Sequence, residues 1–289
     1  MGKKRELFDA ARSHDLPRLL RILSVISKKL SNGDLLSCID DGGNTPLHFA
    51  ALNNFCDDGK ALINYGFSAC TSNYEGYTPM HLASIVGNAE FVSLLCGFDN
   101  CCPSLDMQDR HGNTALHLAI ASNKYSACEA LLQNGCNIYL RNLIHETPLD
   151  GAVGKKNIEM VKLILRHCPA DFSKLTDSAS TPLHIAVRKG SQAMLKILLN
   201  AGFSIDTKTV NGSCLHEAIQ EKNLEIVGFL INKGADLTIK NSSNQTVLEL
   251  IEKLPKEEHL RMRSLIIASQ VRKQNKNLKP GKKLNFVSS

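Results

Sequence analysis

The stretch GNTPLHFAA at residues 43–51 decides the fold, because its central tetrad, Thr45-Pro46-Leu47-His48, returns along the chain. Clear copies are Thr78-Pro79-Met80-His81, Thr114-Ala115-Leu116-His117, Thr147-Pro148-Leu149-Asp150 and Thr181-Pro182-Leu183-His184; weaker copies are Ser213-Cys214-Leu215-His216 and Thr246-Val247-Leu248-Glu249. The steps between their first residues are 33, 36, 33, 34, 32 and 33 residues. A period of this length indicates an array of stacked structural units.

Each residue of the tetrad suits the start of a helix. A threonine at the N-cap accepts a hydrogen bond from an otherwise unpaired backbone N–H, and proline fits the first turn, where no N–H is needed. Leucine then points into the stack, and histidine is placed to hydrogen-bond the neighbouring turn. The alanines that follow, such as Ala50 and Ala51, let a second helix approach closely. We therefore expect each unit to be a pair of helices.

The second helix of each pair is apolar at helical spacing, as in IEMVKLILRH at residues 158–167. Gly66, Gly135, Gly202 and Gly234 fall where such helices end in a left-handed residue. The segments DDGGNT, NYEGYT and QDRHGNT then become the turns that project between helix pairs.

This tetrad and this period resemble the ankyrin repeat. The resemblance implies an all-α solenoid of helix–turn–helix repeats with projecting β-turn loops. We expect six full repeats within residues 41–241, a capping unit at 1–40, a C-terminal cap at 242–270 and a basic, disordered tail at 271–289. The repeats are expected at about 41–73, 74–109, 110–142, 143–176, 177–208 and 209–241.

Three stretches carry a closer resemblance, to the ankyrin–SAM scaffold proteins of the Caskin and Odin type. They are MGKKRELFDAARSHDLPRLLRIL at 1–23, ETPLDGAV at 146–153 and NGSCLHEAIQEKNLEIVGFLINKGADLTIKN at 211–241. The resemblance implies a cytoplasmic signalling adaptor that holds other proteins together. We expect it to act by reversible binding, with no catalytic activity and no cofactor.

The charge is concentrated in the tail. The chain carries a net charge of +6, but residues 261–289 hold eight Arg and Lys and no acid, so the first 260 residues carry 6 − 8 = −2. Within the tail, KKLNF at 282–286 is similar to a docking motif of protein phosphatase regulators, with roles for Lys283, Leu284 and Phe286. The alternative function is therefore a regulatory subunit that docks a phosphatase or another enzyme. The basic tail is also compatible with nuclear import.

Other classes of function find little support in the sequence. No phosphate-binding loop, nucleophile elbow or zincin motif is present, so we expect no enzyme. Cys96, Cys101 and Cys102 have C-x4-C-C spacing rather than the paired C-x2-C that zinc sites prefer, so we expect no metal. No apolar run approaches the roughly 20 residues of a membrane helix. The ten cysteines are interpreted as reduced thiols.

Binding of a protein or peptide on the concave surface of the stack is the favoured function. The side chains that the repeat itself does not dictate lie at turn tips and in first helices. The mostly basic set predicts an acidic partner, with nucleic acid unlikely and the chain a monomer. The candidate contact residues are Tyr74, Tyr77, Arg110, His111, Arg141, His145, Lys155 and Arg188.

Overall fold

A computed structural model of the chain describes residues 2–27, 38–98, 103–168, 175 and 180–277. The chain divides into two compact units, residues 1–169 and residues 170–289, and each is described by itself. In both units the helices come in antiparallel pairs, as the spacing of the tetrads predicts. The chain has the all-α ankyrin-repeat fold that the sequence indicates.

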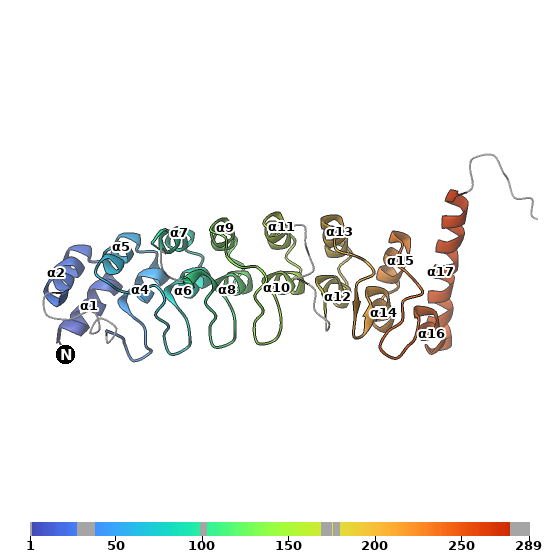
Figure 1. The fold of residues 1–289 in the computed structure, drawn as a ribbon, viewed down its shortest axis with the longest axis horizontal. Coiled ribbons are helices and arrows are strands. Elements are labelled where there is room, and N and C mark those ends of the chain that lie inside the picture. The colour runs from blue at the N-terminus through green and yellow to red at the C-terminus, as the bar shows by residue number, and fades with distance from the viewer. Residues whose placement is uncertain (1, 28–37, 99–102, 169–174, 176–179, 278–289) are drawn as a thin grey trace, which may run out of the picture. The chain divides into compact units, whose positions relative to one another are not determined.

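The first unit contains five helix pairs among its described residues. The first helices of the pairs are α1 (Gly2–Ser13), α4 (Pro46–Asn53), α6 (Pro79–Val86), α8 (Ala115–Ala121) and α10 (Pro148–Gly154). The second helices are α2 (Leu16–Ser27), α5 (Cys56–Asn64), α7 (Ala89–Gly97), α9 (Tyr125–Gln133) and α11 (Ile158–Arg166); a 3-10 helix, η1, spans Pro103–Asp106. Within each set every helix packs against the next, which gives the two layers visible in Figure 1.

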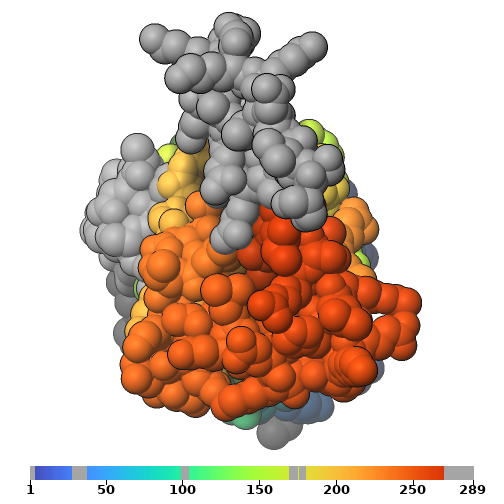
Figure 2. Space-filling model, turned by 90° about the vertical axis from the view of Figure 1, so that its right-hand side faces the viewer, coloured from blue at the N-terminus to red at the C-terminus, as the bar shows by residue number. Residues whose placement is uncertain are grey.

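The second unit repeats the arrangement. Its helices are α12 (Pro182–Arg188), α13 (Gln192–Ala201), α14 (Cys214–Gln220), α15 (Leu224–Lys233), α16 (Val247–Glu252) and α17 (Lys256–Asn277). A two-residue hairpin, β1 (Lys208–Thr209) with β2 (Gly212–Ser213), forms the projecting turn before α14. Helix α17 packs on α15 and α16, and Figure 2 shows this end of the unit in orange and red.

The tetrads begin the first helices as expected. Thr78, Thr114, Thr147 and Thr181 are N-caps in extended conformation, and each hydroxyl accepts a hydrogen bond from the backbone N–H three residues later. The third residue of the first six tetrads is almost completely buried, from Leu47 to Leu215. At the last tetrad Leu248 is 44% exposed. The N-cap thus sets where each helix starts, and within each unit the leucine joins neighbouring pairs through the core.

Two details differ from the sequence-based expectations. Helix α17 continues to Asn277, so the boundary expected at residue 270 lies inside a helix. Cys70 is disulfide-bonded, so the interpretation of all ten cysteines as reduced thiols is wrong for this residue. Cys128 and Cys214 are free and buried, and burial raises the pKa of the Cys128 thiol to about 12. Among the described residues, no helix is both long enough and apolar enough to cross a bilayer.

Candidate partner-binding surface

The tetrad histidines join each helix pair to the next projecting turn. His48 Nδ1 accepts a hydrogen bond from the backbone N–H of Thr45 at 3.0 Å, and its Nε2 lies 2.9 Å from the carbonyl oxygen of Tyr77, one repeat later. The same link joins His81 to Asn113, His117 to Glu146, His184 to Gly212 and His216 to Gln245, at 3.0–3.2 Å. The histidines are therefore structural residues that tie neighbouring repeats together, as the sequence predicts.

This geometry requires a neutral imidazole. In His48, His81, His117 and His216 the Nδ1 atom accepts a hydrogen bond from the backbone N–H of the N-cap residue, while Nε2 donates one to a carbonyl. A second ring proton, on Nδ1, would face that N–H donor. Burial lowers the pKa of His48 and His184 to about 4. Burial also lowers the pKa of His81, His117 and His216. The five side chains stay uncharged at neutral pH, which excludes them as ready cationic contacts for a partner.

Asp150 replaces the histidine in the fourth tetrad. The backbone N–H and the hydroxyl of Thr147 both donate to Asp150 Oδ2, at 3.0 and 2.7 Å, and Arg141 Nη1 lies 3.6 Å from the same oxygen. Asp150 Oδ1 is buried without a hydrogen-bond partner among the described residues. Burial raises the pKa of Asp150 to about 6, against the hydrogen bonds from Thr147. The carboxylate keeps the capping role of the histidine, but it has no proton to donate to a carbonyl.

The projecting turns are here called fingers, and five of the six described ones share an internal clamp; finger 208–212, which begins with Lys208, is the exception. The described fingers are residues 40–44, 73–77, 109–113 and 142–146 in the first unit and 208–212 and 241–245 in the second. In finger 142–146 the side-chain oxygen of Asn142 accepts the backbone N–H groups of Ile144 and Glu146, at 3.2 and 3.0 Å. Asp40, Asn73, Asp109 and Asn241 make the same pair of bonds in their fingers. The clamp fixes the backbone of these fingers and makes no use of the side chains of their second and third residues.

Neighbouring fingers in the first unit also contact one another. Leu143 N donates to the carbonyl of His111 at 2.9 Å, and the amide of Asn142 donates to Asn113 at 3.1 Å. The fourth residue of a finger has positive φ, and in finger 109–113 it is Gly112, whose added Cβ would lie 2.8 Å from the backbone nitrogen of Leu143. Glycine is therefore needed there both for its conformation and for the close approach. In finger 142–146 this position is His145, with φ of 62°.

Four of the predicted contact residues are available at finger tips. Arg110, His111 and His145 are exposed, and Tyr74 is 53% exposed. They lie on fingers 73–77, 109–113 and 142–146, which project from the layer of first helices (Figure 1). These four side chains can reach a partner without any rearrangement of the fold.

The other four predicted residues already make contacts within the chain. Arg141 Nη1 donates to the carbonyl of His145 at 2.7 Å. Arg188 donates to the buried Glu217 at 2.7 Å and to Ser180 at 2.9 Å. Lys155 Nζ donates to the carbonyl of Ala121 at 2.7 Å, and Tyr77 is partly buried with its carbonyl bound to His48. A role in binding stays a prediction for them, and their substitution would also disturb the fold.

The sequence-based selection missed two residues that the structure brings out. Leu143 and Ile144, at the tip of finger 142–146, are 70% and 69% exposed, more than any other large apolar side chain among the described residues. An alignment of the finger sequences reveals this apolar pair. At the second and third positions of the described fingers, Leu143-Ile144 is the only pair with two large apolar residues; Thr209-Val210 has one, and Arg110-His111 and Ser242-Ser243 have none.

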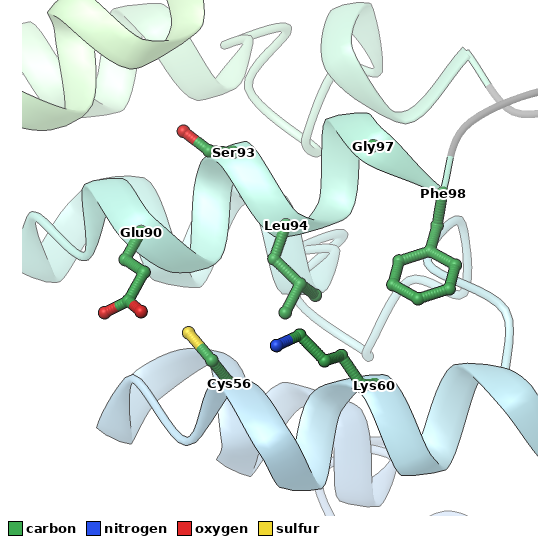
Figure 3. Close-up of a pocket in the computed structure, with 7 residues that line it drawn as sticks. All are labelled: Cys56, Lys60, Glu90, Ser93, Leu94, Gly97 and Phe98. Atoms are coloured by element: carbon green, nitrogen blue, oxygen red, sulfur yellow. The ribbon is translucent and has the colours of Figure 1, made fainter.

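A shallow pocket lies between the second helices α5 and α7, away from the fingers. It is lined by Cys56, Lys60, Glu90, Ser93, Leu94, Gly97 and Phe98. Figure 3 shows the Cys56 thiol, the Lys60 ammonium and the Glu90 carboxylate turned toward the space between the two helices. Burial and the neighbouring Glu90 raise the pKa of Cys56, so the thiol is a poor nucleophile at neutral pH.

Two sequence-based predictions fall on residues outside the described part of the chain. The docking motif with Lys283, Leu284 and Phe286 lies beyond Asn277. Cys101 and Cys102 of the candidate thiol cluster lie between residues 98 and 103. Among the residues that are described, no group of three or more His, Cys, Asp or Glu side chains is arranged to hold a metal ion.

Comparison with known families gives a match to ankyrin repeats over most of the chain, at residues 7–103, 60–142 and 149–241. A mouse protein, B-cell lymphoma 3 protein homolog, is 33% identical over 220 residues, which are 73% of this chain and 48% of that protein. Human transient receptor potential cation channel subfamily A member 1 is 29% identical over 61% of this chain and 16% of its own length. The chain thus spans about half of the first relative and a small part of the second.

The fold is similar to solved structures. The crystal structure of the ankyrin repeat domain of Bcl-3, described as a unique member of the IkappaB protein family, aligns with a TM-score of 0.67 and 29% identity. That alignment covers 78% of this chain and 100% of the solved chain. The human ASB11 ankyrin repeat domain aligns at 24% identity with a TM-score of 0.58, over 77% of this chain and 98% of its own, and supports the fold.

Proposed function

Because the chain belongs to the ankyrin-repeat family, we propose that it is a protein–protein interaction module that binds a protein or peptide on the fingers and first helices of its first unit. The relatives are matched through their ankyrin repeats, which supports binding as the shared role. Rigid repeats with variable exposed tips are suited to this task because the partner contacts can change without a change in the fold.

One observation carries the proposal: the finger backbones are held by the same hydrogen bonds, whereas the residue types at the finger tips differ. The Asx clamp and the histidine link use the same positions in every finger in which they are described. The second and third positions, by contrast, are Tyr74-Glu75, Arg110-His111 and Leu143-Ile144 in three consecutive fingers. Tyrosine and arginine are enriched among the residues that dominate interface affinity. A fixed backbone also reduces the entropy lost when these side chains bind.

The partner is proposed to carry negative charge, and the chain to act as a monomer. Arg110 and His111 are exposed at one finger, and Lys155 and Lys156 follow α10 in the same unit. Such a group of basic side chains accelerates the association of an acidic partner, and the effect weakens with salt.

Affinity capture from cell lysate, read by quantitative mass spectrometry, tests the proposal. The baits are the full chain, the double variant Arg110→Glu/Lys156→Glu, and the control Lys162→Glu, which reverses one charge on the second helix α11. We expect specific partners to drop at least fivefold with the double variant and to be kept by the control. Arg141 and Arg188 are left unchanged because both hold parts of the fold.

A chain that ends at Asn277 completes the experiment. Its partners should match those of the full chain, because the proposed surface lies in the first unit. If partners survive the double variant and are lost with residues 278–289, the proposal fails and the tail becomes the binding element.

The finer assignments are also proposals. We propose that the chain has no catalytic activity of its own and works as a scaffold or adaptor in the cytoplasm. The buried free thiols of Cys128 and Cys214 are compatible with a reducing compartment, whereas the Cys70 disulfide argues for an oxidising one. Localisation of a tagged chain by microscopy decides between them. Membership of the Caskin and Odin type of scaffold stays a prediction from the three resembling stretches, since the relatives reported above are of other types.

A further inference from the structure

The tip of finger 142–146 is an apolar pair with no cover in the described part of the chain. Leu143 and Ile144 are neighbours in sequence, and more than two thirds of each side chain is exposed. Single exposed leucines are ordinary on protein surfaces. Two adjacent large aliphatic side chains at the tip of a projecting turn are not, because a turn needs neither of them for its core and water solvates both poorly.

The backbone under this pair is held in place from several sides. Asn142 clamps the turn from within, Leu143 N donates to His111 O at 2.9 Å, and Arg141 Nη1 donates to His145 O at 2.7 Å. His145 has a positive φ, a conformation that glycine adopts at the same place in three other fingers and Asn244 in finger 241–245. A bulky side chain is strained in this conformation, and the strain at His145 coincides with the exposed pair.

The first helix after this finger, α10, has two glycines, Gly151 and Gly154, here called its glycine face. A Cβ built on either would meet no atom within 4 Å. Glycine is unfavourable within a helix compared with alanine, so these positions give up helix stability and leave open space. That space lets the backbone of a bound segment approach α10 closely.

The charges beside this surface are mostly positive. Arg110 and His111 lie on the adjoining finger, and Lys155 and Lys156 follow Gly154 directly. The acidic groups of the same fingers are Asp109, which is buried and forms the clamp of its finger, Glu146, which is partly buried, and Glu75, which lies one finger beyond Arg110. An occupant with carboxylates beside its apolar residues therefore matches both the apolar tip and its surroundings.

We propose that Leu143 and Ile144 are the central anchors of the binding surface, and that they receive an acidic peptide segment with large apolar side chains, which also lies against the glycine face of α10. This inference rests on the proposed function and names the chemistry of its partner. It is independent of the pocket between α5 and α7 and of the basic tail.

The test is a selection of binding peptides from a displayed library of 16-residue segments, with the full chain as the target. The selected peptides are then measured by fluorescence polarisation against the variant Leu143→Ser/Ile144→Ser. This variant copies Ser242-Ser243, the corresponding pair of finger 241–245, which keeps the same clamp. The matched control is Val210→Ser, which removes an exposed apolar side chain from a finger of the second unit.

We expect peptides enriched in Asp or Glu next to Leu, Ile or Phe. Their affinity should fall at least tenfold with the double serine variant and less than twofold with Val210→Ser. Gly154→Ala should also weaken binding by fivefold or more, whereas Gly228→Ala should not. Gly228 is the matched control because it lies within α15 and its added Cβ also meets no atom within 4 Å.

Three results would overturn the inference. Peptides that bind the double serine variant as tightly as the unchanged chain, or that are enriched in Lys and Arg, place the anchor elsewhere but leave the chain a peptide-binding module. A selection that yields no specific peptide contradicts the proposed function as well. Circular dichroism of each variant confirms that the loss concerns binding rather than folding.

Discussion

Two neighbouring repeats of the first unit, residues 109–122 and 142–155, share a backbone and differ in chemistry. The first has Gly112 at its left-handed position, His117 in its tetrad and Arg110-His111 at its tip. The second has His145, Asp150 and Leu143-Ile144 at the corresponding places, and glycines in its first helix. The first repeat follows the local rules of the fold, and the second departs from them at several positions at once. Departures that gather in one repeat indicate a site where function competes with stability.

The largest effect is expected from acid, because the tetrads with a histidine and the tetrad with Asp150 respond to it in opposite directions. The neutral tetrad histidines have folded-state pKa values below the unfolded value of about 6.5, so the unfolded chain binds more protons and stability falls as pH drops from about 6.5 toward 4. With the pKa of His48 and His184 at about 4, each contributes on the order of 2–3 kcal/mol over this range. Urea titrations at pH 7, 5.5 and 4.5 measure the change in unfolding free energy.

Asp150 works in the opposite direction. Its folded-state pKa of about 6 exceeds the unfolded value of 3.8, so its favourable contribution is present at low pH and is lost as pH rises through about 6. The variant Asp150→Asn should therefore lose stability more steeply than the unchanged chain between pH 6 and pH 4.5. Parallel pH profiles for the two proteins would show that Asp150 is not buried as described.

Exchange of the tetrad residues gives the next largest effect. His117→Asp removes the bond to the carbonyl of Glu146 and buries an acid, and should destabilise the first unit by about 2–4 kcal/mol at pH 7. Asp150→Asn keeps an acceptor for Thr147 and removes a buried charge, so we expect stabilisation of about 1–2 kcal/mol. Thermal unfolding followed by circular dichroism compares both with the unchanged chain. A stabilising His117→Asp would contradict the assigned role of the histidine link.

Exchange of the left-handed residues has a smaller effect and an asymmetric one. His145→Gly relieves a non-glycine residue at positive φ, and should stabilise the protein by about 0.5–1 kcal/mol. Gly112→His should destabilise by about 2 kcal/mol or more, because a Cβ at this position also meets the backbone of Leu143 at 2.8 Å. The denaturant midpoints of the two variants measure the changes in stability. Equal midpoint shifts of the same sign would show that the two fingers do not differ at this position.

The smallest effect on stability is expected from the two glycines of α10. Gly151→Ala and Gly154→Ala should each stabilise α10 by about 0.5–1 kcal/mol, since neither Cβ meets a neighbour. The control Gly228→Ala should stabilise α15 to the same degree. Differential scanning calorimetry resolves such shifts. Destabilisation by the α10 variants, with stabilisation by the control, would show that the open space at α10 does not exist.

The sequence carried enough information for the repeat framework and less for the surface. The tetrad predicts its N-cap because that hydrogen bond joins residues three positions apart. It also predicts the buried leucine and the histidine link because both recur at the same place in successive repeats. The departure at Asp150 was visible, but its buried and unpartnered oxygen was not. Arg141 and Arg188 are predicted contact residues because they are basic and lie near turns. Arg188 instead binds Glu217, 29 positions later, and such a contact depends on how the repeats stack. Leu143 and Ile144 were overlooked because apolar residues usually indicate the core.

The most direct test of the binding surface is hydrogen–deuterium exchange of the full chain, with and without a saturating peptide from the display selection. The account predicts added protection in residues 110–113, 141–146 and 151–156, with α9 and α11 unchanged. Protection that is confined to the second helices, or to the segment around Cys56 and Phe98, would contradict a binding site on the fingers.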